Sequence, residues 1–276
     1  PGNDPSVITV GSANTKGTNA RSDDVVNNFS SRGPTRSAWT DSLGVRHVDN
    51  LLKPDLVAPG NAIVGAAATQ ASSTTPTWNT LGTLFYSQLV ASTGITQSYR
   101  ETQMQLSGTS VAAPAVSGAV ARMPHQNPGL TPPLIKAILQ FTAQPIAGAS
   151  LLQQGAGLLN VDGAVRLSKV LKADIGSALA AGTLKAGDDI LLKSLGAFSS
   201  TVNGVSFNWS RVVFVGGNVV VSGNALFTKF QPFYDPRFVW AWATEATDSA
   251  VIRAATVTLV FMATDDTQKR MGASGA

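Results

Sequence analysis

The chain has 276 residues, 43% of them hydrophobic and only 13% charged, which is typical of a folded protein of one or two domains. Its 20 basic and 16 acidic residues leave a net charge of +4 and are scattered along the chain, which argues against a nucleic-acid partner. It contains no cysteine, so disulfide bonds and cysteine-ligated metals are excluded, and no apolar run reaches the roughly 18 residues of a membrane span.

Short apolar strands alternate with helical stretches over residues 1–171, which predicts an α/β domain. Residues 66–80 are rich in threonine, serine and alanine and are expected to form a loop inserted at the surface. We expect strands at residues 6–12 and 55–58, helices at 109–123, 132–143 and 160–171, and helical propensity around 84–89.

Residues 172–276 differ in character, with β-branched and aromatic runs separated by glycine turns. Gly216 and Gly217 join two valine-rich runs, a pattern typical of a β-hairpin. The sequence therefore predicts a second unit here, a small antiparallel β domain. The runs expected as strands are residues 202–207, 211–215, 218–222, 238–242 and 255–262.

This second unit carries a group of aromatic residues that admits two interpretations. The simpler one is the core of a small β-sandwich, because large aromatic side chains are mostly buried. The functional alternative is a surface that contacts carbohydrate, docks a partner or pairs with further copies of the chain. The residues concerned are Phe227, Phe230, Phe233, Tyr234, Phe238, Trp240 and Trp242.

The segment LSGTSVAAPAVSGAVA, residues 106–121, places a serine between a glycine turn and a helix of small residues. Gly108 allows a sharp turn, Ser110 falls at or near the N-cap, and Pro114 is expected in the first turn. Because the helix lacks a polar stripe, we expect it to be buried on all sides. Its N-terminal N–H groups would stabilise the oxyanion formed when Ser110 attacks a carbonyl. On composition alone, a serine-capped core helix without a catalytic role is the more common case.

Six segments carry a resemblance to a known family. They are VITVGS at 7–12, FSSRGP at 29–34, KPDLVAPG at 53–60, the serine segment at 106–121, LTPPLIKAILQFTAQ at 130–144 and GAGLLN at 155–160. Together, and in this order, they resemble segments of the subtilisin-like serine proteases, the subtilases, whose nucleophile pattern is GTS-small-AAP-x-V-x-G. The resemblance covers residues 1 to about 170 and implies that Ser110 is the nucleophile.

The resemblance also implies a catalytic Asp in a D-[ST]-G turn and a catalytic His before Gly-Thr, both well upstream of the serine. Neither His47 nor His125 precedes Gly-Thr, and both lie in stretches expected to be exposed loops. The family's oxyanion asparagine is missing too, because Asn3 comes too late, so only the Ser110 N–H remains as an oxyanion donor. The aspartates, which likewise come too late for the catalytic role, are Asp23, Asp24 and Asp55.

We therefore expect the chain to begin within the catalytic domain, with long strand edges that would be unpaired in this segment alone. Two explanations follow. The first is the C-terminal product of a cut subtilase that stays bound to its N-terminal part, since two pieces sharing one core lose little when a surface loop is cut. The second is a fragment stabilised by another assembly.

A cation site is also implied by the resemblance, because some subtilases bind Ca²⁺ or Na⁺ through main-chain oxygens and a carboxylate in this region. The corresponding residues are Gly2, Asp4, Val7 and Asp55. The alternative is that Asp55 caps a turn or pairs with Lys53 or Arg32. The reaction itself requires no cofactor.

The function implied is a secreted serine endopeptidase that hydrolyses polypeptide substrates through an acyl-enzyme on Ser110, with Asp and His supplied by an N-terminal part outside this chain. By itself the chain is expected to be inactive. The alternative function is an inactive, subtilase-derived fragment with a structural role, which self-associates through the β-rich residues 172–276.

Overall fold

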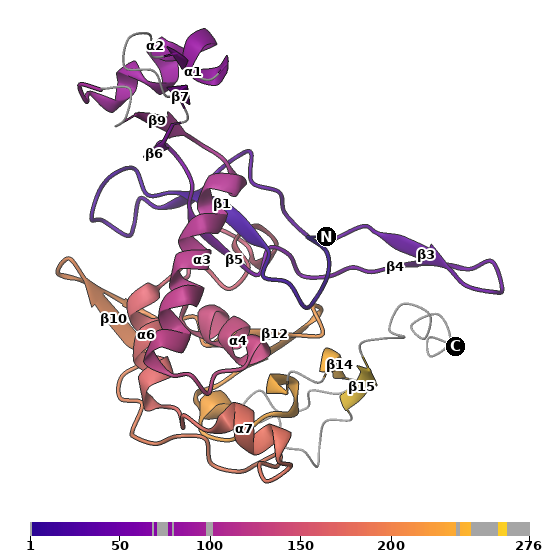
Figure 1. Ribbon diagram of the computed structural model, residues 1–276. Helices are drawn as coiled ribbons and strands as arrows, with labels where there is room; N and C mark the ends of the chain where they lie inside the picture. The colour runs from indigo at the N-terminus through magenta and orange to yellow at the C-terminus, as the bar shows by residue number, and fades with distance from the viewer. Residues whose placement is uncertain are drawn as a thin grey trace.

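A computed structural model of the chain describes residues 2–67, 69–70, 77–78, 80–97, 102–235, 238–243 and 259–263 (Figure 1). Its helices are α1 Thr80–Leu84, α2 Tyr86–Leu89, α3 Thr109–Gln126, α4 Pro132–Thr142, α5 Leu151–Gln154, α6 Val161–Val170 and α7 Ile175–Ala180. Its strands are β1 Val10–Asn14, β2 Val25–Val26, β3 Ala38–Thr40, β4 Arg46–Val48, β5 Leu56–Pro59, β6 Ile63–Ala66, β7 Thr69–Gln70, β8 Thr77–Trp78, β9 Gln103–Leu106, β10 Ser199–Val202, β11 Val205–Asn208, β12 Val212–Val215, β13 Val219–Ser222, β14 Phe238–Ala243 and β15 Leu259–Ala263.

A three-stranded sheet of order β2-β1-β5 lies at the centre of the first part of the chain (Figure 1). Strands β1 and β5 pair in parallel, with Val10 opposite Leu56, and β2 pairs antiparallel with β1. The other edge of β5 is bridged by Leu158. The mixed α/β architecture is therefore confirmed, and among the described strands parallel pairing is shown for the β1–β5 pair.

Strand β5 is buried on both faces, as its continuous apolar run suggests. Leu56 and Ala58 pack into the main core together with residues of α3, while Val57 packs on the opposite face with Ile146 and Leu158. This strand therefore fixes the position of α3 relative to the sheet.

Helix α3 begins where predicted but is covered on one side only. The residues that face β1, β5 and α6 are buried: Ala112, Val116, Ala119 and Met123. The residues on the opposite side are exposed: Pro114, Ala115, Ser117, Gly118, Ala121 and Arg122. The prediction of burial on all sides is wrong for the part of the chain that the structure describes, because small residues permit close packing without determining which face is covered.

Two further helices agree with the predicted ones. Helix α4 is capped by Thr131, whose hydroxyl accepts from the Leu134 N–H, and α6 is capped by Asn160, whose side chain accepts from the Gly163 N–H. The Asn160 amide also donates to the carbonyl of Thr142 at the end of α4, at 2.9 Å. The cap of one helix thus ties the two helices together.

Residues 172–235 form helix α7, two antiparallel hairpins and short turns, so the predicted β unit also contains a helix. The hairpin predicted at Gly216-Gly217 is confirmed as β12–β13. The single strand predicted at 202–207 is wrong, because Asn203 and Gly204, with φ of 51° and 78°, turn the chain between β10 and β11. The predicted division at residue 171 stays a prediction, while the hydrophobic core runs across it without a break.

The aromatic residues of this second part extend the core of the first. Phe227 meets Phe141 of α4 edge to face, with ring centroids 4.7 Å apart, and stacks on Tyr234 at 5.5 Å. Phe230 and Phe233 are buried beside Tyr234. The sandwich interpretation was right about burial and wrong about the partner, which is a helix of the first part. For Phe238, Trp240 and Trp242 the structure describes the backbone of β14, and their side chains lie outside what is described.

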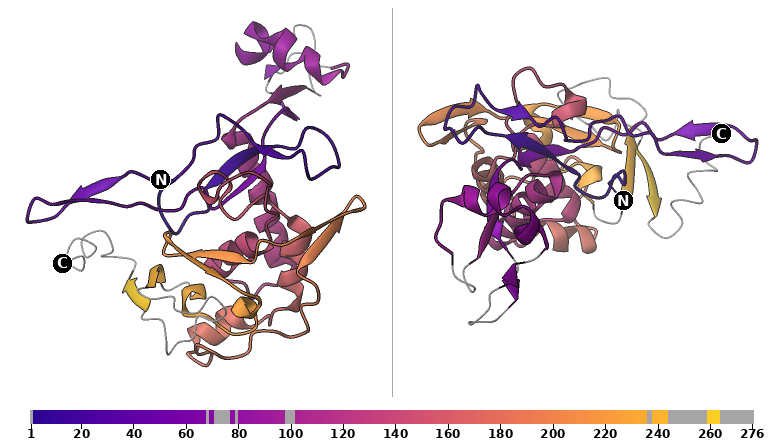
Figure 2. Two further views of the ribbon diagram at one scale, coloured as in Figure 1. Left: turned by 180° about the vertical axis from the view of Figure 1, so that it is seen from behind. Right: turned by 90° about the horizontal axis from the view of Figure 1, so that it is seen from above.

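Two segments project from this body (Figure 2). One is the β3–β4 hairpin, and the other is an arm that leaves through β6, carries α1 and α2 and returns through β9. The arm agrees with the predicted surface insertion and bears exposed apolar side chains, among them Leu81, Leu84 and Phe85. Among the described helices, none has the length and apolar character needed to cross a membrane.

Candidate active site around Ser110

The start of α3 is fixed by the turn that follows β5. Gly60 accepts a hydrogen bond from the Gly108 N–H at 2.9 Å and donates its own N–H to Ala13 at the end of β1, at 3.0 Å. A Cβ on Gly60 would lie 2.7 Å from the Gly108 carbonyl oxygen and 2.9 Å from the Ala112 Cβ. The glycine of the KPDLVAPG segment is therefore required by the close approach of α3.

Ser110 is the second residue of α3 and is exposed to solvent. The N-cap is Gly108, whose carbonyl accepts from Val111 and Ala112, so the prediction that Ser110 lies at or near the N-cap is correct to within two residues. Ser110 lies in the first turn, where helical N–H groups have no intrahelical partner and the helix dipole favours negative charge. The Gly108 N–H places this first turn beside Gly60, just past the carboxyl end of β5, the edge at which open α/β sheets bind ligands.

Pro114 occupies the sixth position of α3 and not the first turn. Its ring has no N–H, so the helical hydrogen bond to the Ser110 carbonyl cannot form. Pro124 lies inside the helix as well, and α3 continues past it to Gln126, three residues beyond the predicted end. The prolines therefore loosen the backbone hydrogen bonding of α3 without ending it.

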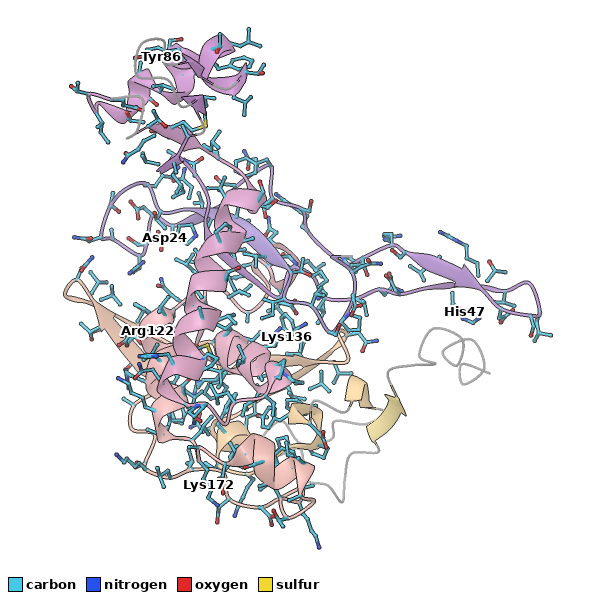
Figure 3. All side chains as sticks on the ribbon, in the orientation of Figure 1. Asp24, His47, Tyr86, Arg122, Lys136 and Lys172 are labelled. Atoms are coloured by element: carbon cyan, nitrogen blue, oxygen red, sulfur yellow. The ribbon has the colours of Figure 1, made fainter. Side chains whose placement is uncertain are left out.

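Both histidines lie far from Ser110. His125 is in the last turn of α3, 15 residues after Ser110, which corresponds to about 22 Å along the helix axis. His47 is in β4, on the projecting hairpin and away from the start of α3 (Figure 3), where its Nε2 lies 2.8 Å from Asp41 Oδ2. Bonding to His47 holds the pKa of Asp41 below its usual value. Within the described residues, neither histidine is placed to take a proton from Ser110.

The candidate aspartates do not reach Ser110 either. Asp23 accepts from the Thr18 hydroxyl at 2.8 Å. Asp24 is 3% exposed, and neither of its oxygens has a hydrogen-bond partner among the described residues; Arg21 Nη1 is 3.9 Å away. Burial raises the pKa of Asp24 above its ordinary value, and the charge of Arg21 opposes this.

Replacing Asp24 by asparagine is expected to stabilise the fold. A carboxyl whose folded pKa exceeds its unfolded value stabilises the protein at low pH and loses that contribution as pH rises through the folded pKa. Asp24→Asn should therefore raise the free energy of unfolding at pH 7 by roughly 1 kcal/mol. The parent should lose stability as pH rises above about 4, and the variant should lose less. Urea unfolding between pH 4 and 7 measures this, with Asp174→Asn, at an exposed aspartate, as the control that gains nothing; an unchanged pH slope in Asp24→Asn would contradict it.

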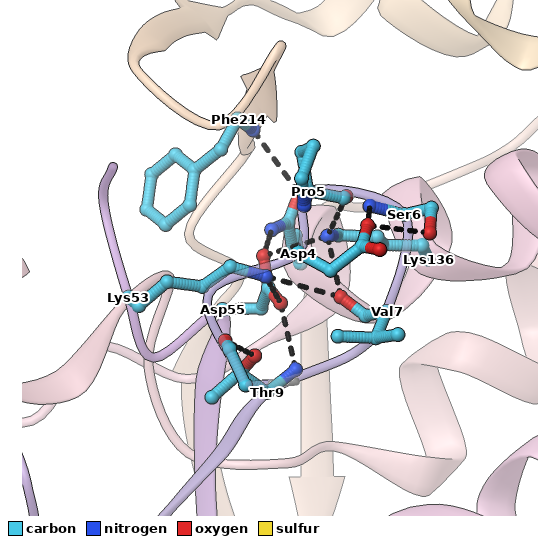
Figure 4. Close-up of polar contacts among 11 residues, drawn as sticks. Asp4, Pro5, Ser6, Val7, Thr9, Lys53, Asp55, Lys136 and Phe214 are labelled. Carbon is cyan, nitrogen blue, oxygen red and sulfur yellow. Dashed lines mark hydrogen bonds and ion pairs between the residues drawn. The ribbon is translucent and has the colours of Figure 1, made fainter. Parts of the chain in front are cut away.

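The residues predicted to hold a cation are brought together only in part (Figure 4). Asp4 accepts from the backbone and hydroxyl of Ser6, and the Gly2 carbonyl accepts from the Thr9 hydroxyl. The Val7 carbonyl and the Asp55 carboxylate do converge, but both are bonded to lysine ammonium groups. The described residues contain no cluster of three or more acidic or histidine side chains arranged to hold a metal.

Asp55 is the centre of a buried polar network. It is 1% exposed and accepts from Lys53 Nζ at 2.9 Å, Lys136 Nζ at 3.0 Å, Gln140 Nε2 at 3.0 Å and the Thr9 N–H at 2.8 Å. The alternative interpretation, pairing with Lys53, agrees with this geometry. The donor set leaves Asp55 saturated, so the site does not fit a metal ion as it stands.

Lys136 and Gln140 were missed by sequence reasoning. They lie one helical turn apart on α4, where the neighbouring Leu134, Ile135, Ala137, Ile138 and Leu139 are all apolar and buried. Two polar residues at this spacing in such a helix were the available signal that a buried polar partner faces them. Burial lowers the pKa of Lys136 to about 8, against the opposing charge of Asp55, so the ammonium form predominates at pH 7.

A groove of about 330 Å³ borders Thr109, the residue before Ser110. It is bounded by β1 and the FSSRGP turn, and its lining includes Val10, Gly11, Ser31, Arg32 and Gly33. The groove provides room for a further polypeptide segment next to the start of α3.

The chain was compared with protein families and with known proteins, and both comparisons found matches. The subtilase family model matches residues 1–165. Serine protease AprX of Bacillus subtilis (strain 168) is 30% identical over 165 residues, covering 60% of this chain and 31% of AprX. Subtilisin-like protease SBT2.3 of Arabidopsis thaliana is 35% identical over 122 residues, covering 42% of this chain and 12% of that protein.

Among solved structures, fervidolysin from Fervidobacterium pennivorans, described as a keratinolytic enzyme related to subtilisin, is 25% identical with a TM-score of 0.41. That match covers 60% of this chain and 20% of fervidolysin. The chain thus spans about a third of the length of AprX and a smaller share of the other two proteins.

Proposed function

This chain belongs to the subtilase family, and on that premise we propose that it is the nucleophile-bearing portion of a serine endopeptidase. The observation that carries the proposal is the placement of Ser110: exposed, in the first turn of α3, and next to the turn that closes the carboxyl end of the β1–β5 pair. A hydroxyl in this position has the Ser110 N–H beside it to stabilise an oxyanion, because the first N–H groups of a helix have no intrahelical partner.

The proposed reaction is acyl transfer through Ser110. The Oγ forms a bond to the carbonyl carbon of a peptide while its proton passes to a histidine. The peptide C–N bond then breaks, and the same histidine gives the proton to the departing amine. Water hydrolyses the resulting ester and restores the serine. In this scheme the described residues contribute the Ser110 hydroxyl as nucleophile and the Ser110 N–H as oxyanion donor.

The histidine and aspartate must come from another polypeptide segment, which we propose to be an N-terminal part of the same protease bound to this chain. Two features support this. The exposed side of α3 is lined by small residues, and a Cβ added at Gly118 would meet nothing within 4 Å, so there is room for a close neighbour. The groove beside Thr109 lies on the same end of the helix as Ser110. By family resemblance, we also propose that the protein is secreted.

A fluorophosphonate probe tests the proposal. In protein purified from its native source, intact-mass analysis should show a bound N-terminal polypeptide and one added phosphonyl group on Ser110, while the isolated chain should stay unlabelled. Ser110→Ala should remove all labelling. Ser117→Ala, which changes an exposed serine two turns along the same helix, should label as the parent does.

The competing function is an inactive, subtilase-derived structural protein that self-associates through its β-rich second part. It is favoured if Ser110 in the native preparation stays unlabelled under conditions that label a control subtilase. Labelling of both Ser110→Ala and the parent would also overturn the assignment of the nucleophile.

A further inference from the structure

Three oxygen atoms from two distant parts of the chain converge on one nitrogen. The ammonium of Lys136 lies 2.7 Å from the Pro5 carbonyl, 2.8 Å from the Val7 carbonyl and 3.0 Å from Asp55 Oδ1 (Figure 4). Two main-chain carbonyls and a carboxylate are the kind of oxygens that bind hard cations in proteins. Here their partner is the end of a side chain from α4.

The geometry matches an ammonium group and not a metal ion. A protonated lysine has three N–H donors and no acceptor, and it meets three acceptors at ordinary hydrogen-bond distances. Calcium would require six to eight oxygens at about 2.3–2.6 Å. All three N–H donors of Lys136 are therefore used. A metal ion at this place would have to share each of the three oxygens with the ammonium group.

The charges around Lys136 also favour an ammonium group over a metal ion. A second ammonium, Lys53 Nζ, lies 3.1 Å from the Val7 carbonyl and 2.9 Å from Asp55 Oδ2. Two positive charges thus face the single buried carboxylate of Asp55, and the remaining positive charge is close to the exposed Asp4, whose pKa both lysines help to lower. A divalent ion added here would be repelled by both lysine charges, which Asp55 and Asp4 already offset, and no third carboxylate is described beside it.

The network is also anchored, so that Lys136 cannot easily be displaced. Gln140, one turn after Lys136, donates to Asp55 Oδ1 and accepts from the Phe214 N–H at 3.0 Å. Lys136 and Asp55 are 12% and 1% exposed. The N-terminal segment, β5, α4 and β12 therefore meet at one buried junction that the two lysines complete.

We propose that the Lys136 ammonium takes the place of a structural cation at this junction, so that the chain folds without a bound metal ion. The proposal goes beyond the protease assignment and does not depend on it, because it concerns how the N-terminal segment is attached to β5 and α4. It also accounts for the convergence of Val7 and Asp55, two of the residues at which sequence resemblance placed a cation.

Thermal unfolding of the full chain with and without cations tests the proposal. The parent should unfold at the same temperature in 5 mM CaCl₂, in 200 mM NaCl and in EDTA, after correction for ionic strength. Lys136→Met should unfold at a temperature several degrees lower, and Ca²⁺ or Na⁺ should recover part of that loss with saturable binding in calorimetry. Lys172→Met, at a half-buried lysine whose Nζ donates to the Asp189 carbonyl at the surface, is the control that should respond to neither.

Each other result overturns the proposal. Stabilisation of the parent by Ca²⁺, reversed by EDTA, would show that a metal binds despite Lys136. Unchanged stability of Lys136→Met would show that the ammonium holds nothing together, and a loss that no cation recovers would make Lys136 an ordinary buried ion-pair partner. If Lys136→Met does not fold, Lys136→Gln, which keeps an N–H donor and removes the charge, carries the same measurements.

Discussion

Replacing Asp55 by alanine is expected to lower the free energy of unfolding by about 3–5 kcal/mol, the usual effect of removing one partner from a buried ion pair. The change leaves two buried ammonium groups, Lys53 and Lys136, without their shared carboxylate. It also removes the acceptor of the Thr9 N–H and of the Gln140 amide. The loss is therefore mostly the cost of uncompensated buried charge.

Urea unfolding followed by the fluorescence of the buried Trp209 measures this change. Asp55→Asn keeps the shape of the side chain and removes the charge, so it should also be strongly destabilised. Asp189→Ala is the matched control, because Asp189 pairs with Lys229 at the surface, where ion pairs contribute about 0–1 kcal/mol. Equal stability of Asp55→Asn and the parent would mean that the charge of Asp55 does not hold this junction together.

The elements that the sequence predicts well are those with a local cause. Gly216-Gly217 is a hairpin because both residues adopt positive φ, which glycine does without strain. Helix α4 begins at Pro132 after a threonine cap, as its sequence indicates. The strand expected at 202–207 fails for a local reason as well, because Asn203 and Gly204 adopt positive φ and form a turn despite the β-branched residues around them.

The features that the sequence does not predict depend on contacts between distant segments. Which face of α3 is covered depends on where β1, β5 and α6 lie, and the small residues of the helix are compatible with any choice. The Lys136–Asp55 pair joins α4 to the start of β5; the spacing of Lys136 and Gln140 indicates a buried polar partner, but nothing in the sequence identifies that partner as Asp55. For Ser110, the family segments name the residue, while its exposure and its neighbours come only from the packing of α3 on the sheet.

Gly60→Ala is expected to destabilise the chain by about 3 kcal/mol, at the upper end for overpacking in a well-packed region. The added methyl group would clash with the Ser12 hydroxyl and approach the Gly108 carbonyl oxygen to 2.7 Å. That carbonyl is the first acceptor of α3, bonded to Val111 and Ala112, so it cannot move without shifting the first turn of the helix. The Ser12 hydroxyl is held in turn by the Asn27 amide at 2.8 Å.

Gly118→Ala provides the matched control, because the same methyl group there meets nothing within 4 Å and alanine favours a helix interior by about 1 kcal/mol over glycine. The urea concentration at the midpoint of unfolding should therefore fall for Gly60→Ala and rise for Gly118→Ala. Because Gly60 positions the turn that carries Ser110, the assembled protease that we propose should also lose about 10²-fold in its rate of fluorophosphonate labelling, as expected if a nucleophile is displaced. Loss of stability without slower labelling would show that the first turn of α3 keeps its position independently of the β5 turn.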